Sequence, residues 1–290
     1  MKKLIPLFVA ALSVGLAFAG GDADKIAKDC KVFKQSKMQG FDWVQFEFEG
    51  CEAWLVEPAV PAKDGRWVWC MEWPTAFQDR TGVKALLAAG YRWVTFNPAY
   101  APFIKVTEGN QTDEMVEKRH RFQQYLVKTL GLNAKCGLIG MSWGGFYSVR
   151  YASIHPEAVK AAYLDAPLLD VSTLGSYPRS YKNYQKYYPF LTPEYVGADD
   201  PFQSVNRAAP IAAAKIPLLV LYGGKDTVVP PAKNIERFAP VFEKNGGDLT
   251  LVKRGTFGHH PHGVDPCETA VIVNFFEKAF NPPPPPKAKK

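Results

Sequence analysis

The first third of the chain alternates hydrophobic and polar residues in the manner of antiparallel strands. Residues 41–48 and 51–56 each carry apolar side chains at about every second position. A strand with this period has one face buried and one face in water. The two segments therefore predict an N-terminal antiparallel hairpin.

The pattern then changes to denser apolar runs separated by helix-like segments. Residues 66–71 and 91–96 are runs of strand length, and residues 82–89, which end at Gly90, are helix-like. A strand, a helix and a second strand in succession predict a parallel pair. The alternation continues, with strands predicted at 136–141, 159–164, 217–222 and 249–253 and helices at 115–130 and 267–280. We therefore expect an α/β fold with a mostly parallel central sheet and flanking helices.

One segment breaks this alternation. Residues 168–209 are rich in Tyr and Pro, lack a clean period and are too long for a turn, so we expect a short cap insertion over a site. With 47% hydrophobic residues, the chain can bury one large core, and residues 20–280 are expected to form one domain. Residues 281–290 are rich in Pro and Lys and predict a disordered tail.

The first 19 residues have the composition of a cleavable secretory signal. Lys2 and Lys3 precede an apolar run at 4–17, and the small residues around Ala19 suit cleavage before Gly20. This run is shorter than the roughly 20 residues that cross a bilayer, so a membrane anchor is the less favoured alternative. The expected location is periplasmic or secreted, with no membrane attachment after cleavage.

The net charge of +7 is concentrated at the two ends of the chain. Two of these charges leave with the signal, and three belong to the tail, at Lys287, Lys289 and Lys290. The body has no cluster of Lys and Arg interleaved with aromatic residues, so nucleic acid is not an expected partner. No residue pattern fixes an oligomeric state.

The chain has five cysteines, an odd number for an exported protein. Cys70 and Cys136 fall in apolar runs and are expected to be small buried residues. Cys30 and Cys51 bracket the N-terminal hairpin and form the most plausible disulfide, with two free thiols as an equal alternative. The fifth is Cys267.

Three polar side chains follow predicted parallel strands at the end where ligands bind in such sheets. Ser142 lies in a G-x-S-x-G pattern after one strand, Asp226 follows another, and His259 follows the last. Glycines at 140 and 144 let a strand and a helix approach closely around a strained turn at the serine. The turn also places the serine at a helix start, where backbone N–H groups stabilise negative charge.

These stretches resemble the α/β-hydrolase superfamily, from about residue 50 to residue 280. The resemblance rests on residues 140–144, 222–230 and 258–260, and it implies the α/β-hydrolase fold. The tryptophans near residue 67 and the histidine-rich stretch 258–263 also look like a group of exported bacterial members.

The chemistry assigns the roles. A serine hydroxyl becomes a nucleophile when a histidine removes its proton and a carboxylate orients that histidine. Ser142 would attack, His259 would accept the proton and Asp226 would hold the His259 ring. Asp165 is the alternative acid because it also ends a predicted strand, and His260 is the alternative base.

The oxyanion donors are expected at two backbone positions. The first is the N–H of Trp143, whose ring is also the best candidate for a pocket wall. The second is the N–H of Trp73 or Glu72, in the loop after Met71. This loop departs from the His-Gly-Gly pattern of many lipases and esterases.

An alternative interpretation of the loop at residues 259–265 is a metal-binding site. His259, His260, His262 and Asp265 are residue types that bind zinc. Pro261 between them and the lack of ligands elsewhere argue against it, because a catalytic zinc needs three convergent ligands. No metal and no cofactor is therefore expected.

The sequence predicts an exported serine hydrolase that cleaves carboxylic esters through an acyl-enzyme. Its expected partner is a small-molecule substrate, a small or sugar-linked ester. A serine peptidase of the same fold is the alternative among enzymes, although such peptidases usually bring a propeller or a larger cap. A non-catalytic binding protein on a hydrolase scaffold is the alternative from another class, and the complete set of Ser, Asp and His argues against it.

Overall fold

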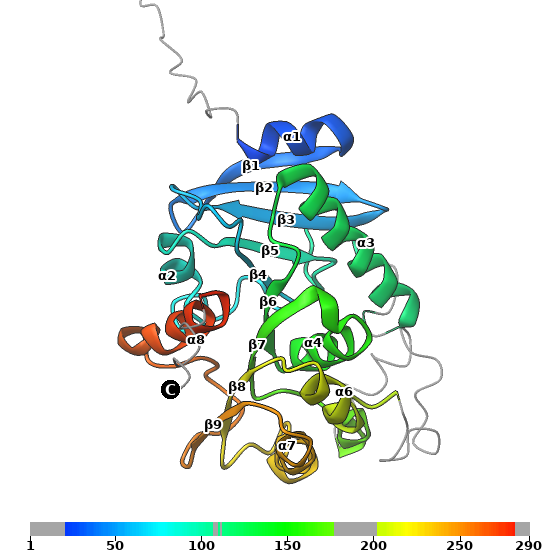
Figure 1. Ribbon diagram of the computed structural model, residues 1–290, viewed down its shortest axis with the longest axis vertical. Coiled ribbons are helices and arrows are strands. Elements are labelled where there is room, and N and C mark those ends of the chain that lie inside the picture. Colours follow the sequence, from blue (N-terminus) through cyan, green and yellow to red (C-terminus); the bar gives the residue numbers. More distant parts are fainter. Residues whose placement is uncertain (1–20, 107–109, 111, 177–201, 282–290) are drawn as a thin grey trace, which may run out of the picture.

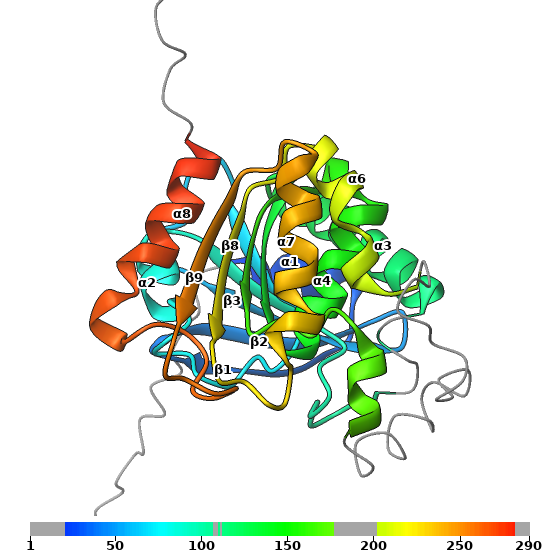
Figure 2. The same cartoon turned by 90° about the horizontal axis from the view of Figure 1, so that it is seen from below.

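A twisted sheet runs through the molecule with helices on both faces (Figures 1 and 2). The computed structural model describes residues 21–106, 110, 112–176 and 202–281. Within these residues the sheet has nine strands in the order β1-β2-β3-β5-β4-β6-β7-β8-β9. The expected signal, most of the tail and the middle of the cap insertion lie outside the described residues.

The sheet is antiparallel at its N-terminal side and parallel elsewhere. Strands β1 to β3 are antiparallel neighbours, and β3 also pairs antiparallel with β5. The pairs from β5 through β4 to β9 are all parallel, as the strand and helix alternation predicts. The strands are β1 (Val32–Met38), β2 (Phe41–Phe48), β3 (Cys51–Glu57), β4 (Trp67–Cys70), β5 (Arg92–Phe96), β6 (Cys136–Met141), β7 (Val159–Asp165), β8 (Leu218–Gly223) and β9 (Leu249–Arg254).

The N-terminal hairpin forms, but the expectation of one wet face is wrong for β3. Residues 51–56 are all buried, because β3 lies between β2 and β5 with packing on both faces. Leu55 belongs to the core on one face of the sheet, whereas Trp54 and Val56 belong to the core on the other. β1 extends the hairpin at the sheet edge, and its residues alternate too weakly for the sequence pattern to predict it.

The helices divide between the two faces of the sheet (Figure 2). The α2 and α8 helices contribute Leu86 and Ile272 to one core, and the remaining helices contribute residues such as Phe122 and Phe146 to the other. The helices are α1 (Asp22–Asp29), α2 (Val83–Ala88), α3 (Asp113–Leu130), α4 (Trp143–Ile154), α6 (Ala208–Ala213), α7 (Ile235–Lys244) and α8 (Ala270–Phe280). Five short 3₁₀ turns complete the described elements: η1 (Pro156–Ala158), η2 (Val171–Ser176), η3 (Ser204–Asn206), η4 (Pro231–Lys233) and η5 (Pro266–Glu268).

Local chemistry sets the helix ends that differ from the sequence expectation. The α3 helix starts before residue 115 because the Thr112 side chain accepts a hydrogen bond from the Met115 N–H at 3.2 Å. Its last residue is Leu130, as expected, and the C-cap residue Gly131 has a φ of 69°. The α8 helix starts only at Ala270, since the preceding residues form the η5 turn.

None of the five cysteines forms a disulfide in the described structure, so the expected bond between Cys30 and Cys51 is absent. Cys70 and Cys136 are buried in strands, as expected, and burial raises the pKa of both thiols above the usual range. Cys267 is exposed. In the described part of the chain, no helix combines the length and the apolar character that a membrane crossing requires.

Candidate active site

Ser142 occupies a sharp turn between β6 and α4. Its φ is 49°, in the left-handed region that a non-glycine residue rarely adopts. Three backbone hydrogen bonds hold this conformation: the Ser142 N–H donates to the Asp165 carbonyl at 3.0 Å, and the Ser142 carbonyl accepts from the Gly145 and Leu168 N–H groups at 2.9 Å each. These three hydrogen bonds therefore hold the Ser142 backbone in a strained conformation.

Two glycines flank the serine at tight contacts, as the motif predicts, and the tighter of the two is at Gly140. A Cβ on Gly140 would lie 2.6 Å from the Gly144 carbonyl oxygen. A Cβ on Gly144 would meet the Glu72 backbone nitrogen at 3.3 Å. The start of α4 thus packs against both β6 and the loop after β4.

The loops after β8 and β9 are joined to each other by backbone contacts. The Gly224 N–H donates to the Arg254 carbonyl and the Lys225 N–H donates to the Phe257 carbonyl, both at 2.9 Å. A Cβ on Gly223 would lie 2.1 Å from the Gly258 carbonyl oxygen, so only glycine allows this approach. The two loops therefore hold a fixed position relative to each other.

Ser142, His259 and Asp226 form a continuous chain of hydrogen bonds. The His259 Nε2 atom lies 3.1 Å from the Ser142 Oγ, and the His259 Nδ1 lies 2.8 Å from the Asp226 Oδ2. The other oxygen, Asp226 Oδ1, accepts from the Val228 and Val229 N–H groups at 2.9 and 2.8 Å. The two side chains behind the serine are almost fully buried, with 5% of His259 and 1% of Asp226 exposed. The structure brings together the three residues that the strand-end pattern selects.

Asp165 lies against a different histidine. Its Oδ1 is 2.7 Å from the His262 Nδ1, and its Oδ2 accepts from the Gly263 N–H and the Tyr163 hydroxyl, both at 2.9 Å. This geometry excludes Asp165 as the partner of His259, because both of its oxygens are used elsewhere. The second pair of Asp and His was missed by the sequence analysis, which assigned His262 no partner.

His260 does not contact the serine in the described structure, where the ring that faces Ser142 is that of His259. The His260 side chain is exposed and stacks on Phe77 with ring centroids 5.7 Å apart. Partial burial, and then the neighbouring His259 and His262, lower the pKa of His260. The geometry thus favours His259 over the alternative base.

The expected second oxyanion donor is already engaged. The Trp73 N–H donates to the Glu72 Oε1 at 3.0 Å, and the same oxygen accepts from the Ala99 N–H at 3.1 Å. The Asn110 side chain donates to the other oxygen at 3.3 Å. Glu72 is buried, and this burial raises the pKa of its carboxyl group. A buried carboxyl group is costly unless nearby donors form hydrogen bonds with it. The structure therefore turns the Trp73 amide toward Glu72, whereas the Trp143 N–H lies in the first turn of α4 beside the serine.

A cavity of about 350 Å³ opens beside the serine. Among the described residues its wall is mainly apolar, and Trp143 forms part of it, as the sequence suggests. The lining residues are Trp73, Ala76, Phe77, Ser142, Trp143, Leu168, Val228, Val229, His259, His260 and His262. A larger cavity of about 570 Å³, near Lys160 and Lys215, touches none of the three hydrogen-bonded residues. The chemistry therefore belongs to the smaller cavity.

The family described as alpha/beta hydrolase fold matches residues 80–205, which include the turn at Ser142. The described chain has the parallel sheet with flanking helices that this description implies. The chain has the α/β-hydrolase fold. No curated protein matches it in sequence.

Solved structures of α/β-hydrolases resemble the chain at low identity. An acylaminoacyl peptidase from Pyrococcus horikoshii is 15% identical, with a TM-score of 0.61, over 88% of this chain and 43% of that one. An esterase from Pyrococcus furiosus is 17% identical, with a TM-score of 0.55, over 86% of this chain and 92% of that one. An acetyl xylan esterase from Thermoanaerobacterium is 16% identical, with a TM-score of 0.54, over 83% and 86%. This chain spans less than half the length of the peptidase and most of the length of both esterases.

Residues 168–209, where a cap insertion was expected, are described at both ends, and these ends contact each other and Asn234, which precedes α7. The Val205 N–H donates to the Leu169 carbonyl at 2.9 Å, and the Gln203 side chain donates to Asp170 at 2.9 Å. The Asn234 side chain accepts from the Leu169 and Asp170 N–H groups at 2.7 and 2.9 Å. Residues 169–170 and residues 203–205 therefore lie side by side, next to Leu168 in the cavity wall.

Proposed function

We propose that this α/β-hydrolase cleaves carboxylic esters through an acyl-enzyme formed on Ser142. The observation that carries the proposal is the hydrogen-bonded series from Ser142 Oγ through His259 to Asp226 at the wall of the cavity. Such a series activates a serine because the histidine accepts its proton while the carboxylate stabilises the imidazolium.

The proposed reaction has two steps. His259 Nε2 takes the Ser142 proton as Oγ attacks the ester carbonyl, and the bond to the alcohol breaks as His259 returns the proton to the leaving oxygen. Water then attacks the acyl-enzyme with His259 as the base, which releases the carboxylic acid and restores the Ser142 hydroxyl. The Trp143 N–H is the proposed donor to the oxyanion in both steps, since amides at a helix start stabilise developing negative charge.

A small ester is the proposed substrate. The cavity of about 350 Å³ is at the lower end of the usual range for small-molecule sites, and its aromatic wall suits an aryl or sugar group. The similarity to esterases along most of their length supports this choice. The similarity to the acylaminoacyl peptidase supports a serine peptidase as the second candidate.

Two measurements on the purified protein separate these candidates. A fluorophosphonate probe should label the wild type and leave Ser142→Ala unlabelled. Turnover should then be compared for an ester and an amide with the same acyl and aryl groups, p-nitrophenyl acetate and p-nitroacetanilide, together with acetylated xylo-oligosaccharides and aminoacyl p-nitroanilides. Ester-selective, Ser142-dependent turnover supports the esterase, faster amide cleavage supports the peptidase, and no labelling at all refutes the serine hydrolase.

The proposed site of action is outside the cytoplasm. This part of the proposal rests on the basic and apolar residues of the first 19 positions. In a bacterial host, the exported protein should begin at Gly20. Sequencing of its N-terminus checks this, and an intact Met1 on all of the protein would contradict export by cleavage.

A further inference from the structure

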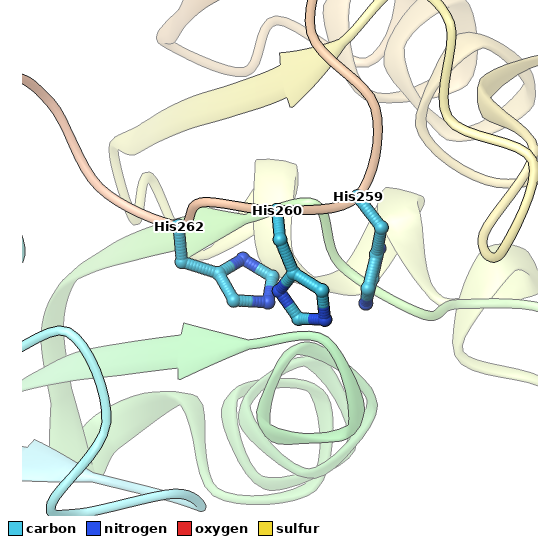
Figure 3. Close-up of side chains that lie close together, drawn as sticks. All are labelled: His259, His260 and His262. Atoms are coloured by element: carbon cyan, nitrogen blue, oxygen red, sulfur yellow. The ribbon is translucent and has the colours of Figure 1, made fainter.

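Three histidine rings gather in the loop that follows β9. The rings of His259, His260 and His262 lie pairwise 4.8 to 4.9 Å apart between centroids. They extend from the loop to the same side (Figure 3). One nitrogen of each ring lies within 4.8 Å of the corresponding nitrogens of the other two.

Two of these rings are held by carboxylates. Asp226 lies 2.8 Å from the Nδ1 of His259, and Asp165 lies 2.7 Å from the Nδ1 of His262. In each of these two rings, Nε2 is therefore the atom available to bind a metal ion. Histidines that bind metals have this arrangement, because a carboxylate on one ring nitrogen fixes the tautomer and makes the other nitrogen a better ligand.

The loop itself is held in place by two arginines. Arg80 donates to the His262 carbonyl at 2.9 Å, and Arg254 donates to the Gly263 carbonyl at 2.6 Å. His259 and His262 are buried, whereas His260 is exposed and stacks on Phe77 with ring centroids 5.7 Å apart. At zinc–nitrogen distances of about 2.0–2.1 Å, three nitrogens around one ion lie roughly 3.3 Å apart. Binding one ion with all three rings thus requires ring nitrogens to shift by about an ångström or more, and His260 is the exposed residue of the three.

The surrounding charges favour a dication. The Asp165 and Asp226 carboxylates stand directly behind the rings, and Arg254, 3.4 Å from Asp165, offsets part of this negative charge. The described residues that line the cavity include no Lys or Arg. A metal ion in this place therefore meets imidazole nitrogens at the front and the two carboxyl groups behind the rings.

We propose that His259, His260 and His262 bind a transition-metal dication such as Zn²⁺, and that the bound ion switches off the serine chemistry. Imidazole nitrogens suit zinc, copper and nickel. The ion takes the Nε2 lone pair of His259, which is the atom that accepts the Ser142 proton. Binding of the ion is independent of the proposed function, and inhibition by the ion rests on it.

Another cluster of potential ligands offers an internal control. His120 and His155 stack 3.9 Å apart near Glu157, and one ligand atom from each of the three lies close together. There, however, both ring nitrogens of His155 already face carboxylates, Glu117 at 2.9 Å and Glu157 at 3.4 Å. This surface cluster is thus less suited to a shared ion. Asp265 belongs to neither cluster, because it caps the η5 turn.

Calorimetric titration with ZnCl₂ tests the binding. The protein should carry no histidine tag and should first be dialysed against a chelator. The wild type and His120→Ala are expected to bind one ion with equal affinity, whereas His260→Ala and Asp165→Asn bind it about 10- to 100-fold more weakly. His260→Ala changes an exposed side chain and should fold normally. MgCl₂ should not bind, since magnesium prefers oxygen ligands. Equal zinc affinity in the wild type and His260→Ala overturns the assignment.

Turnover of p-nitrophenyl acetate tests the inhibition. Zn²⁺ should reduce wild-type turnover, and a chelator should restore it. Each variant is compared with its own metal-free rate, and the half-inhibiting concentration should rise about tenfold or more in His260→Ala. Binding without inhibition overturns the inhibitory role. Ser142→Ala should still bind zinc in calorimetry, so a failure of the proposed esterase function leaves the metal site tested separately.

Discussion

Replacing Asp226 by Asn should abolish most of the activity while leaving the fold intact. The Asp226 Oδ1 accepts two backbone N–H groups, from Val228 and Val229. An asparagine must place its carbonyl oxygen there, because its amide nitrogen cannot accept these hydrogen bonds. The amide nitrogen then faces the Nδ1 of His259, at the position now occupied by the Asp226 Oδ2.

This orientation inverts the tautomer of His259. The amide donates to Nδ1, so the ring proton moves to Nε2, which lies 3.1 Å from the Ser142 Oγ and can no longer accept its proton. Loss of the correct tautomer in such an arrangement lowers kcat by about 10⁴-fold. At about 1.36 kcal/mol for each factor of ten, the transition state loses about 5.4 kcal/mol.

Asp165→Asn provides the matched control. Asp165 is also a buried carboxylate on a histidine Nδ1, but its partner His262 does not contact the serine in the described structure. The control should lose at most about tenfold in kcat/KM, and its main effect should be a lower thermal midpoint, since unpairing a buried polar group costs about 1–3 kcal/mol. Initial rates on p-nitrophenyl acetate and circular dichroism on the same samples check this. Equal losses in the two variants, or less than tenfold loss in Asp226→Asn, would refute the assignment of the acid.

Two further substitutions test the packing around the serine. Gly140→Ala should destabilise the protein by about 1–3 kcal/mol and reduce turnover, because the added Cβ would lie 2.6 Å from the Gly144 carbonyl oxygen. Gly255→Ala, where a Cβ meets nothing within 4 Å, is its control in urea unfolding, and similar free energies of unfolding in both variants would contradict the contact argument. Burial raises the pKa of the Glu72 carboxyl group above its usual value of 4.5, against the opposing effects of its hydrogen-bond donors and of Arg119. A raised pKa in the folded state stabilises the fold below pH 4.5, and this contribution is lost as the pH rises toward the folded pKa. In Glu72→Gln, the free energy of unfolding should therefore depend less on pH across that range. Urea unfolding at a series of pH values measures this dependence. If the wild type and Glu72→Gln show the same dependence on pH, Glu72 is not the titrating group.

The sequence by itself determined how strands and helices follow one another along the parallel part of the chain. Residues 136–141 are a dense apolar run, and β6 has the same bounds, because a strand buried on both faces leaves an unambiguous signal. At the sheet edge, where β1 alternates only weakly between more and less buried residues, the signal fades. The edge strand β1 was not predicted, and neither was α7, which contains Pro240.

The candidate residues were likewise determined by position in the chain. Ser142, Asp226 and His259 each follow a parallel strand, and parallel strands end at the same edge of the sheet. Strand ends alone could not separate Asp226 from Asp165, since both satisfy this rule. The choice depended on which carboxylate each histidine faces.

Only the tertiary structure decided those pairings. Asp165 and His262 are 97 positions apart, and their contact depends on the path of a loop that Arg80 and Arg254 hold from other elements. The Trp73 amide turns toward Glu72 because a buried carboxyl group gathers donors from three segments of the chain. Periodicity reports which face of an element is buried, whereas the direction of a loop side chain is set by hydrogen bonds with partners distant in sequence.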